Sequence, residues 1–384
     1  MSAPLFTSFF ADYDRSIKNR IVEEGYDLYF SRPLGFIFAK WLSALKLSPT
    51  NISVVGMLIG VSGGVMLSQQ NVLFYTALGG LLVTFAGILD SSDGQAARLY
   101  NTHTEMGRYL DMFNDMLVFI ACYAGGLYYF VDTYTWYGFW GLGLLSGYMH
   151  SLKSNIYEYY KGEFLHFSLT DSKNRNYSLE YIRENFDRTG LIRSITYPIL
   201  IDYVRRQNQN KFRVDATTAL FEKARAYKPE EFKDIYIQES RKLLALWAWV
   251  CGSNVMRNGL IISSLFGRMD IYVIANIFSY FLFLGVGKLQ QRVDRRIEER
   301  IRCTTVSERV MNVSDLLVET VPHVARGVLL DATHALVTTF EADLLRSGGA
   351  RDLDDDAALD ATTAAQEVIN AVLIHTRMKR KVDS

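Results

Sequence analysis

The sequence has little cysteine, no excess of charge of either sign, and none of the common short motifs for zinc or nucleotide binding. Its three cysteines, Cys122, Cys251 and Cys303, are odd in number and far apart, so no disulfide framework or zinc spacing follows. The 41 basic and 41 acidic residues cancel, and we therefore expect no nucleic-acid partner. An HExxH pattern, a P-loop and a GxGxxG fingerprint are all absent from the 384 residues. Any chemistry must come from other residues.

Long apolar runs are the main feature that the sequence does have. Hydrophobic residues make up 49% of the chain and the mean hydropathy is +0.05, which predicts a membrane core joined to polar segments. Several runs are shorter than the ~20 residues that span a bilayer, but polar or aromatic residues extend them. We therefore expect an all-α integral membrane protein with a bundle of six transmembrane helices. The runs are residues 52–67, 72–89, 110–131, 136–149, 243–265 and 271–286.

Two further patterns concern how helices meet lipid and each other. Residues 32–47 have apolar residues at helical spacing with Lys40, Trp41 and Lys46 among them, which predicts an amphipathic helix lying on the bilayer. An ordinary amphipathic helix packed on a soluble domain is the alternative. Small residues spaced by four allow close helix packing in lipid. Such glycines are Gly56, Gly60 and Gly64 in the first run, and Gly143 and Gly147 in the fourth.

Charge is distributed unequally between the two ends of the expected helices. Three connections, at 68–71, 132–135 and 266–270, contain no basic residue except Arg268. The opposite side holds the N-terminal region, a long polar insertion and the C-terminus, all rich in lysine and arginine. The positive-inside rule places that side in the cytoplasm.

These patterns divide the chain into three parts. Residues 1–48 form a cytoplasmic N-terminal segment with the interfacial helix, 49–290 the membrane domain, and 291–384 a helical cytoplasmic tail. The membrane domain contains a cytoplasmic insertion at 151–242, whose first residues favour a continuation of the fourth helix into the cytosol. An apolar patch at 196–203 is expected to touch either the membrane or the helix bundle. The arginines of the insertion either bind an anionic acceptor or are solvated.

Four aspartates stand where two apolar runs meet the cytoplasmic side. Asp90 and Asp93 are spaced i,i+3, and Asp111 and Asp115 are spaced i,i+4, so each pair shares one helix face. A tight turn near 101–104 would make the two helices antiparallel neighbours and bring the four acids together. Carboxylates so close repel one another unless cations neutralise them. Oxygen ligands of this kind suit Mg²⁺ or Mn²⁺.

The pattern Asp-x2-Asp-Gly-x2-Ala-Arg-x8-Gly-x3-Asp-x3-Asp resembles the signature of the CDP-alcohol phosphatidyltransferases. Every fixed position is present; the residues are Asp90, Asp93, Gly94, Ala97, Arg98, Gly107, Asp111 and Asp115. A second element resembles the family's Pro-Asn-x-x-Thr segment, with Pro49, Thr50 and Ser53 in register. Here threonine and serine replace the usual asparagine and threonine. The same residues also read as a helix N-cap.

The resemblance implies a reaction, its cofactors and roles for these residues. A hydroxyl attacks the β-phosphorus of a CDP-linked substrate and CMP leaves. Asp90, Asp93 and Asp111 are implied as metal ligands, with Asp115 near a second metal and as the general base. Gly94 and Gly107 would let the nucleotide approach the backbone, and Ala97 would keep the cytidine pocket open. Arg98 would pair with a phosphate or with a motif carboxylate. Pro49, Thr50 and Ser53 would face the nucleotide. A homodimer is also expected from the resemblance.

Substrate direction and two unrelated functions remain as alternatives. The first expectation is phosphatidyl transfer from CDP-diacylglycerol to a polar alcohol, and the second is transfer from a CDP-alcohol to a lipid alcohol. An intramembrane prenyltransferase also uses aspartates and Mg²⁺, but it needs a second aspartate cluster that the runs after residue 136 do not contain. An ion transporter would have ionisable residues along several helices. In the later runs, Arg257 is the one charge inside an apolar segment.

Overall fold

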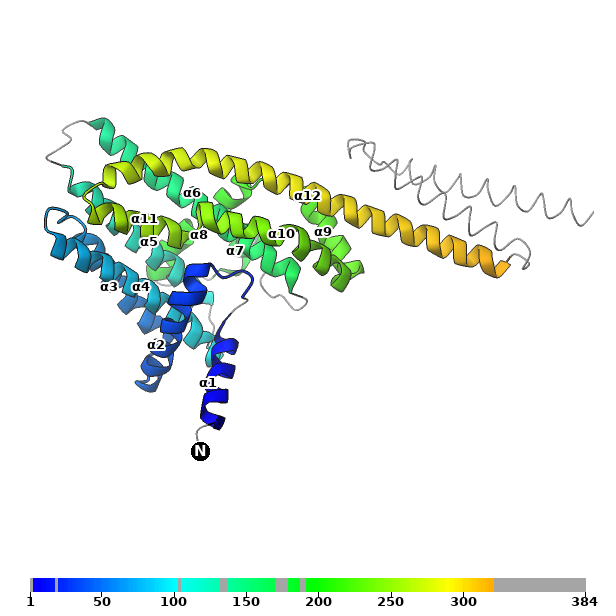
Figure 1. Cartoon of the computed structure of the whole chain (residues 1–384), viewed down its shortest axis with the longest axis horizontal. Helices are drawn as coiled ribbons and strands as arrows, with labels where there is room; N and C mark the ends of the chain where they lie inside the picture. Colours follow the sequence, from blue (N-terminus) through cyan, green and yellow to red (C-terminus); the bar gives the residue numbers. More distant parts are fainter. Residues whose placement is uncertain are drawn as a thin grey trace, which may run out of the picture. The chain divides into compact units, whose positions relative to one another are not determined.

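We describe the chain from a computed structural model, which places residues 3–17, 20–102, 105–131, 137–169, 179–186 and 191–320. Every element in these ranges is a helix, in agreement with the expected all-α fold (Figure 1). The chain divides into two compact units, Met1–Glu298 and Glu299–Ser384, and the features discussed below belong to the first. Most of the expected tail lies outside the described residues.

The helices follow one another along the chain with few long connections. They are α1 (Ala3–Ser16), the short π-helix η1 (Asp27–Ser31), α2 (Arg32–Ala44), α3 (Pro49–Met66), α4 (Leu73–Leu99), α5 (Glu105–Tyr128), α6 (Tyr137–Ser168), α7 (Leu179–Asn185), α8 (Leu191–Asn210), α9 (Asp215–Tyr227), α10 (Pro229–Cys251), α11 (Ser253–Leu265) and α12 (Met269–Thr320).

Within the residues that the structure describes, four helical segments are long and apolar enough to cross a membrane, and they indicate an integral membrane protein. They are Pro49–Met66, Leu73–Leu99, Leu110–Tyr128 and Met269–Arg302. The other two expected runs look different in the structure. The run at 136–149 lies largely in the first half of α6, which continues without a break to Ser168 as the sequence favoured. The run at 243–265 is divided, because Gly252 has an extended backbone between α10 and α11. The count of six transmembrane helices stays a prediction.

Helix α3 packs against both α4 and α5, and glycine makes this possible. A Cβ atom built on Gly60 would lie 2.7 Å from a methyl of Val118, and one on Gly64 would lie 2.6 Å from the backbone of Ala121. From the other side, a Cβ on Gly125 of α5 would overlap the carbonyl oxygen of Gly64. The glycines spaced by four in α3 therefore face its neighbours, and two backbones approach closely without intervening side chains.

This close approach predicts that Gly125→Ala destabilises the protein. Alanine normally stabilises a helix by ~0.5–1 kcal/mol relative to glycine, but here the added methyl would force α3 and α5 apart, at a cost of about 1–3 kcal/mol or more. Thermal unfolding in detergent measures the difference. Gly285→Ala in α12 is the matched control, because a Cβ atom at that position would have no other atom within 4 Å. Equal unfolding temperatures for the two variants would contradict the proposed packing.

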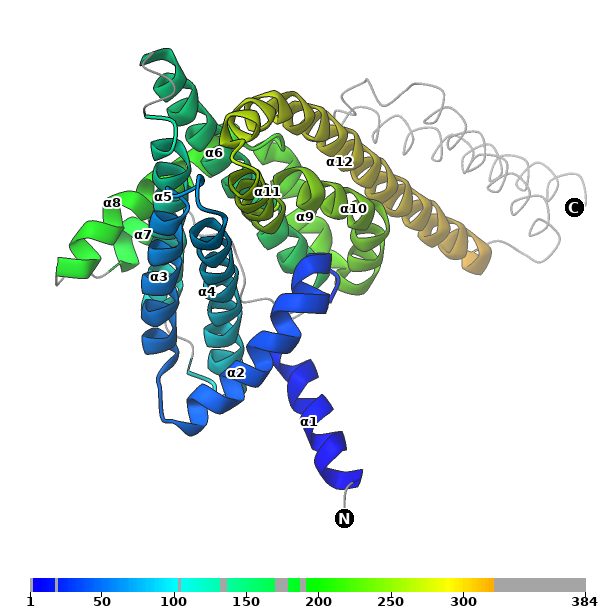
Figure 2. The same ribbon diagram turned by 60° about the vertical axis from the view of Figure 1, so that its left-hand side comes forward.

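Helix α2 lies across one end of α4 (Figure 2). Phe36 and Ala39 are buried, whereas Ile37 and Trp41 are 55% and 58% exposed. Gly35 permits the contact, since a Cβ there would come within 2.7 Å of Gln95 Oε1. One face of α2 therefore packs on the bundle and an apolar face remains open. That the open face rests on the bilayer stays a prediction.

The insertion folds as helices that pack on the bundle. The apolar patch at 196–203 belongs to α8, where buried Leu200 packs with Ile182 of α7, and Met112 of α5 packs against the same cluster. Of the two expected contacts for this patch, the structure shows the one with the helix bundle.

A buried ion-pair network ties the insertion to α6 and α12. The Arg213 side chain, between α8 and α9, is 0% exposed; its Nη1 donates to Glu163 Oε2 at 2.7 Å and its Nη2 to Asp294 Oδ1 at 2.8 Å. Burial opposes the charge of Arg213, but Tyr236, Asp294 and Glu163 outweigh it and raise the pKa of the guanidinium well above its ordinary value. Four aromatic rings lie 5.0–6.0 Å from the guanidinium carbon: Tyr160, Phe167, Phe221 and Tyr236.

Candidate active site

The four motif aspartates lie on two successive helices that both contact α3 and α11. Asp90 and Asp93 are on α4, and Asp111 and Asp115 are on α5. Asn101, which follows the C-cap residue Tyr100 of α4, has a left-handed backbone with φ 53°, as is common just after a helix ends. Asp93 is buried, whereas Asp90 and Asp115 are exposed. Asp111 is half-buried, so three of the four motif aspartates have solvent-accessible surface.

The start of α3 reaches the same carboxylates. Ser53 Oγ donates to Asp111 Oδ1 at 3.2 Å, and it accepts from Asn114 Nδ2 at 2.7 Å. Ser48 caps the helix by accepting from the backbone N–H of Asn51 at 3.2 Å. Pro49 is the first residue of α3, and Thr50, which follows it, is exposed. The second sequence element is thus both a helix cap and part of the site, through Ser53.

The charge distribution fits a divalent cation. The charges of Asp90, Asp111 and Asp115 all repel the Asp93 carboxylate, whose Oδ2 is buried without a hydrogen-bond partner among the described residues. Within the same residues, no three histidine, cysteine, aspartate or glutamate side chains are already arranged to hold a metal ion. The oxygen donors and their uncompensated charge nevertheless suit Mg²⁺ or Mn²⁺. A bound cation would relieve the repulsion, with Asp90, Asp93, Asp111 and Asp115 as its candidate ligands.

Arg98 has a partner that the sequence did not indicate. Its Nε donates to the carbonyl oxygen of Ser16 at the end of α1, and Gln95 Nε2 donates to Ser16 Oγ at 3.0 Å. In the described part of the chain Arg98 forms no ion pair with a motif carboxylate, and its buried Nη2 lacks a hydrogen-bond partner. A Cβ on Gly94 would meet only the Arg98 guanidinium, at 3.6 Å. The arginine therefore contacts the N-terminal helix.

Two other signature residues lie near the ends of the helices that carry the aspartates. Ala97 is half-buried in the last turn of α4. Gly107 is half-buried in the first turn of α5. Both positions are close to the connection between α4 and α5, whereas Asp90 and Asp115 lie further along their helices.

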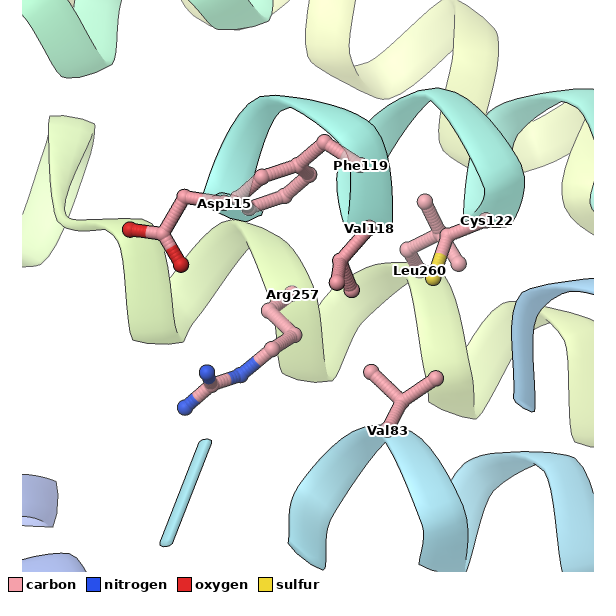
Figure 3. Close-up of a pocket in the computed structure, with 7 residues that line it drawn as sticks. All are labelled: Val83, Asp115, Val118, Phe119, Cys122, Arg257 and Leu260. Atoms are coloured by element: carbon pink, nitrogen blue, oxygen red, sulfur yellow. The ribbon is translucent and has the colours of Figure 1, made fainter. Parts of the chain in front are cut away.

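A small pocket beside Asp115 contains an arginine to which the sequence analysis gave no role. The pocket has a volume of ≈ 20 Å³, room for a water molecule and not for a nucleotide. Arg257 of α11 lines it and acts electrostatically on both Asp90 and Asp115. Figure 3 shows the Asp115 carboxylate and the Arg257 guanidinium at the same side of the pocket. The other lining residues are Val83, Val118, Phe119, Cys122 and Leu260. A charge inside an apolar segment was the signal that could have identified Arg257.

Further charged groups surround the site outside the candidate membrane spans. Lys161 Nζ lies 3.3 Å from Glu158 Oε1 on α6. Burial opposes the Lys161 charge, but Glu158 and three acids of the N-terminal segment, Glu23, Glu24 and Asp27, raise its pKa above the ordinary value. Burial, Glu158 and Asp115 together raise the pKa of the nearby Tyr203. The N-terminal segment and α6 thus contribute charge close to Asp115.

Comparison with known proteins identifies the segment that carries this site. A search of curated proteins finds no match to the chain. The family model described as CDP-alcohol phosphatidyltransferase matches residues 46–158, which include Ser53 and all four motif aspartates. This family generally depends on divalent metals, and its substrates are a CDP-alcohol and an alcohol at a membrane. Over the segment 46–158 the chain is similar to the CDP-alcohol phosphatidyltransferases, a family of transferases of substituted phosphate groups.

Proposed function

We propose that the protein transfers a phosphatidyl group from CDP-diacylglycerol to a polar alcohol and releases CMP. The observation that carries this proposal is the gathering of α3, α4 and α5 around the motif, with Ser53 bound to Asp111 and with Asp115 exposed beside it. The acids are near the end of apolar helix α4, which supports a site where a lipid enters from the bilayer and the alcohol from water. The charge asymmetry of the sequence supports a site that faces the cytoplasm.

The residues divide the chemistry between binding and proton transfer. The acceptor hydroxyl gives its proton to a carboxylate oxygen of Asp115 as its oxygen forms a bond to the β-phosphorus of the donor. The bond between that phosphorus and the bridging oxygen breaks, and the electron pair leaves with CMP. A divalent cation held by Asp90, Asp93 and Asp111 would supply neutralising charge for the diphosphate. The Ser53 hydroxyl orients Asp111. Glycines 94 and 107 and Ala97 would leave space for the cytidine.

The experiment that tests this function is a screen for CMP release by the purified full-length protein. CDP-diacylglycerol is offered with serine, glycerol 3-phosphate, inositol, inositol phosphate or choline. We expect release with one of these acceptors. Release only from CDP-choline or CDP-ethanolamine with diacylglycerol would instead support the opposite arrangement of donor and acceptor. Failure of all pairs would refute the proposal. A homodimer stays a prediction, which mass measurement in detergent would check.

Metal removal should stop the reaction reversibly. We expect EDTA to abolish CMP release and Mg²⁺ or Mn²⁺ to restore it, because the four carboxylates cannot bind a diphosphate without added positive charge. Binding is measured separately: Mg²⁺ should raise the unfolding temperature of the unmodified protein and have a much smaller effect on Asp93→Asn. Turnover that persists in EDTA, or an equal Mg²⁺ effect on both proteins, would contradict the shared-carboxylate site.

A further inference from the structure

In the described part of the chain, Arg257 lies beside the proposed reaction centre without a carboxylate partner. Among the residues that the structure describes, no acid lies within salt-bridge distance of it, and its buried Nε has no hydrogen-bond partner. Asp90 and Asp115 are nevertheless close enough to interact with it electrostatically. Its guanidinium lies against Gly87 of α4, where a Cβ would overlap it. The molecule therefore provides space for this arginine and leaves part of its hydrogen-bonding capacity unused.

Asn254, one turn earlier on α11, forms a hydrogen bond with that guanidinium. Its Oδ1 accepts from Arg257 Nη2, and its Nδ2 donates to Glu24 Oε2 at 3.0 Å and to Asp27 Oδ2 at 2.8 Å. Since arginine only donates and the ionised carboxylates only accept, the amide has one orientation that satisfies all three partners. Asn254 is buried, so these bonds are shielded from water. The amide thus links Arg257 to the N-terminal segment.

The N-terminal segment is itself fixed at this point. Glu24 is 7% exposed, and its carboxylate lies next to Gly252, where a Cβ would be 2.9 Å from Oε1. This position is directly before the N-terminus of α11, which favours a negative charge. Burial raises the pKa of Glu24 to about 7. Whether or not the carboxyl group is protonated, one of its oxygens has free lone pairs and accepts the hydrogen bond from Asn254. Glu24 and Asp27 therefore anchor the asparagine.

We propose that Arg257 contacts a phosphate oxygen of the bound substrate and that Asn254, held by Glu24 and Asp27, is its positioning residue. This inference rests on the proposed function. Planar guanidinium donors match phosphate oxygens, and the contact would lie on the α11 side of the site, beside the metal-binding carboxylates. The phosphate belongs either to the diphosphate of the donor or to a phosphorylated acceptor. Both sources offer phosphate oxygens to the guanidinium, and the CMP-release assay distinguishes them.

The test compares Arg257→Ala, Arg257→Lys, Asn254→Leu and the Arg257→Ala/Asn254→Leu double variant in the CMP-release assay. We expect Arg257→Ala to lower kcat/KM about 10- to 100-fold, the loss typical of one charged hydrogen bond, and Arg257→Lys to recover part of it. Asn254→Leu should lose about tenfold alone and almost nothing further in the Arg257→Ala background. Arg268→Ala is the control, because Arg268 is 57% exposed and pairs with Asp270.

The choice of acceptor in the CMP-release assay identifies the source of the phosphate. If the accepted alcohol carries no phosphate, a loss assigns the contact to the donor diphosphate. If the accepted alcohol is phosphorylated, a raised KM for the acceptor with an unchanged KM for CDP-diacylglycerol assigns the contact to the acceptor, and the reverse pattern assigns it to the donor. Arg257→Ala within twofold of the unmodified protein, or losses that multiply in the double variant, would overturn the inference. A purely structural role for Asn254 would give such multiplication.

A binding measurement keeps this inference separate from the proposed function. Inorganic pyrophosphate with Mg²⁺ should raise the unfolding temperature of the unmodified protein, and the rise should be clearly smaller in Arg257→Ala. If the unmodified protein releases no CMP with any acceptor, the proposed function fails, and this binding measurement alone then tests the phosphate contact of Arg257. Equal shifts in the two proteins exclude the donor diphosphate as the partner of Arg257. Equal shifts with glycerol 3-phosphate as well, or no shift in either protein, would overturn the phosphate contact of Arg257.

Discussion

Asp115→Asn is expected to lower the rate of CMP release about 100- to 10,000-fold, the range that a general base contributes. An amide cannot take the proton of the acceptor hydroxyl, and Asp115 is the exposed acid at the α11 side of the motif. The unfolding temperature should not fall, because the substitution removes one charge from a cluster of repelling carboxylates.

The control for this variant is Asp270→Asn. Asp270 lies at the start of α12 and pairs with Arg268, which is 57% exposed. It is not part of the motif, so its loss should leave turnover within about twofold. Asp115→Asn with unchanged turnover would remove this residue as the base. An inactive variant that has also lost its cooperative unfolding would not count as support, which is why both measurements are made on the same preparation.

Arg213→Met should produce the largest loss of stability of any single substitution considered. It removes the guanidinium that bonds both Glu163 and Asp294, whose side chains are 8% and 7% exposed, so that two buried carboxylates lose this ion-pair partner. Breaking a buried ion pair from one side costs about 3–5 kcal/mol. We expect a correspondingly lower unfolding temperature in detergent, measured against the unmodified protein.

A matched arginine and a combined variant sharpen this test. Arg296, on the same helix as Asp294, is 59% exposed and lies 3.5 Å from Glu239, so Arg296→Met should change the free energy of unfolding by less than about 1 kcal/mol. Adding Glu163→Gln and Asp294→Asn to Arg213→Met should recover much of the stability, because the two carboxylate charges that lost the guanidinium are then removed as well. Equal effects of Arg213→Met and Arg296→Met would refute the role of the network.

Local spacing was enough to predict the parts of the site that lie on single helices. The i,i+3 and i,i+4 aspartates follow from helix periodicity. Ser53 was expected to face the nucleotide from the family resemblance alone, and in the structure it bonds to Asp111. The glycines of α3 were expected at helix contacts because they repeat every four residues, and Gly64 indeed meets α5. In each case the information lies within one turn or a few turns of the chain.

The remaining features depend on contacts between distant segments, which local spacing does not contain. Arg257 reaches Asn254 locally, but Asn254 meets Glu24 across 230 positions, and Arg98 meets Ser16 across 82. The sequence also did not predict the end of α10 at Gly252, because apolar residues continue on both sides of this glycine. A single glycine in an apolar run is compatible with an unbroken helix, so only the packing around it decides.

The length of α4 ties the depth of the acids to the thickness of the surrounding lipid. From Leu73, where α4 begins, to Asp90 is a rise of about 26 Å, at ~1.5 Å per residue, against about 30 Å for a typical hydrocarbon layer. In a bilayer with longer acyl chains, the carboxylates would lie within the hydrocarbon layer. In a bilayer with shorter chains, they would lie among the headgroups. Because charged groups resist such immersion, hydrophobic mismatch should favour bilayers of one thickness around this protein.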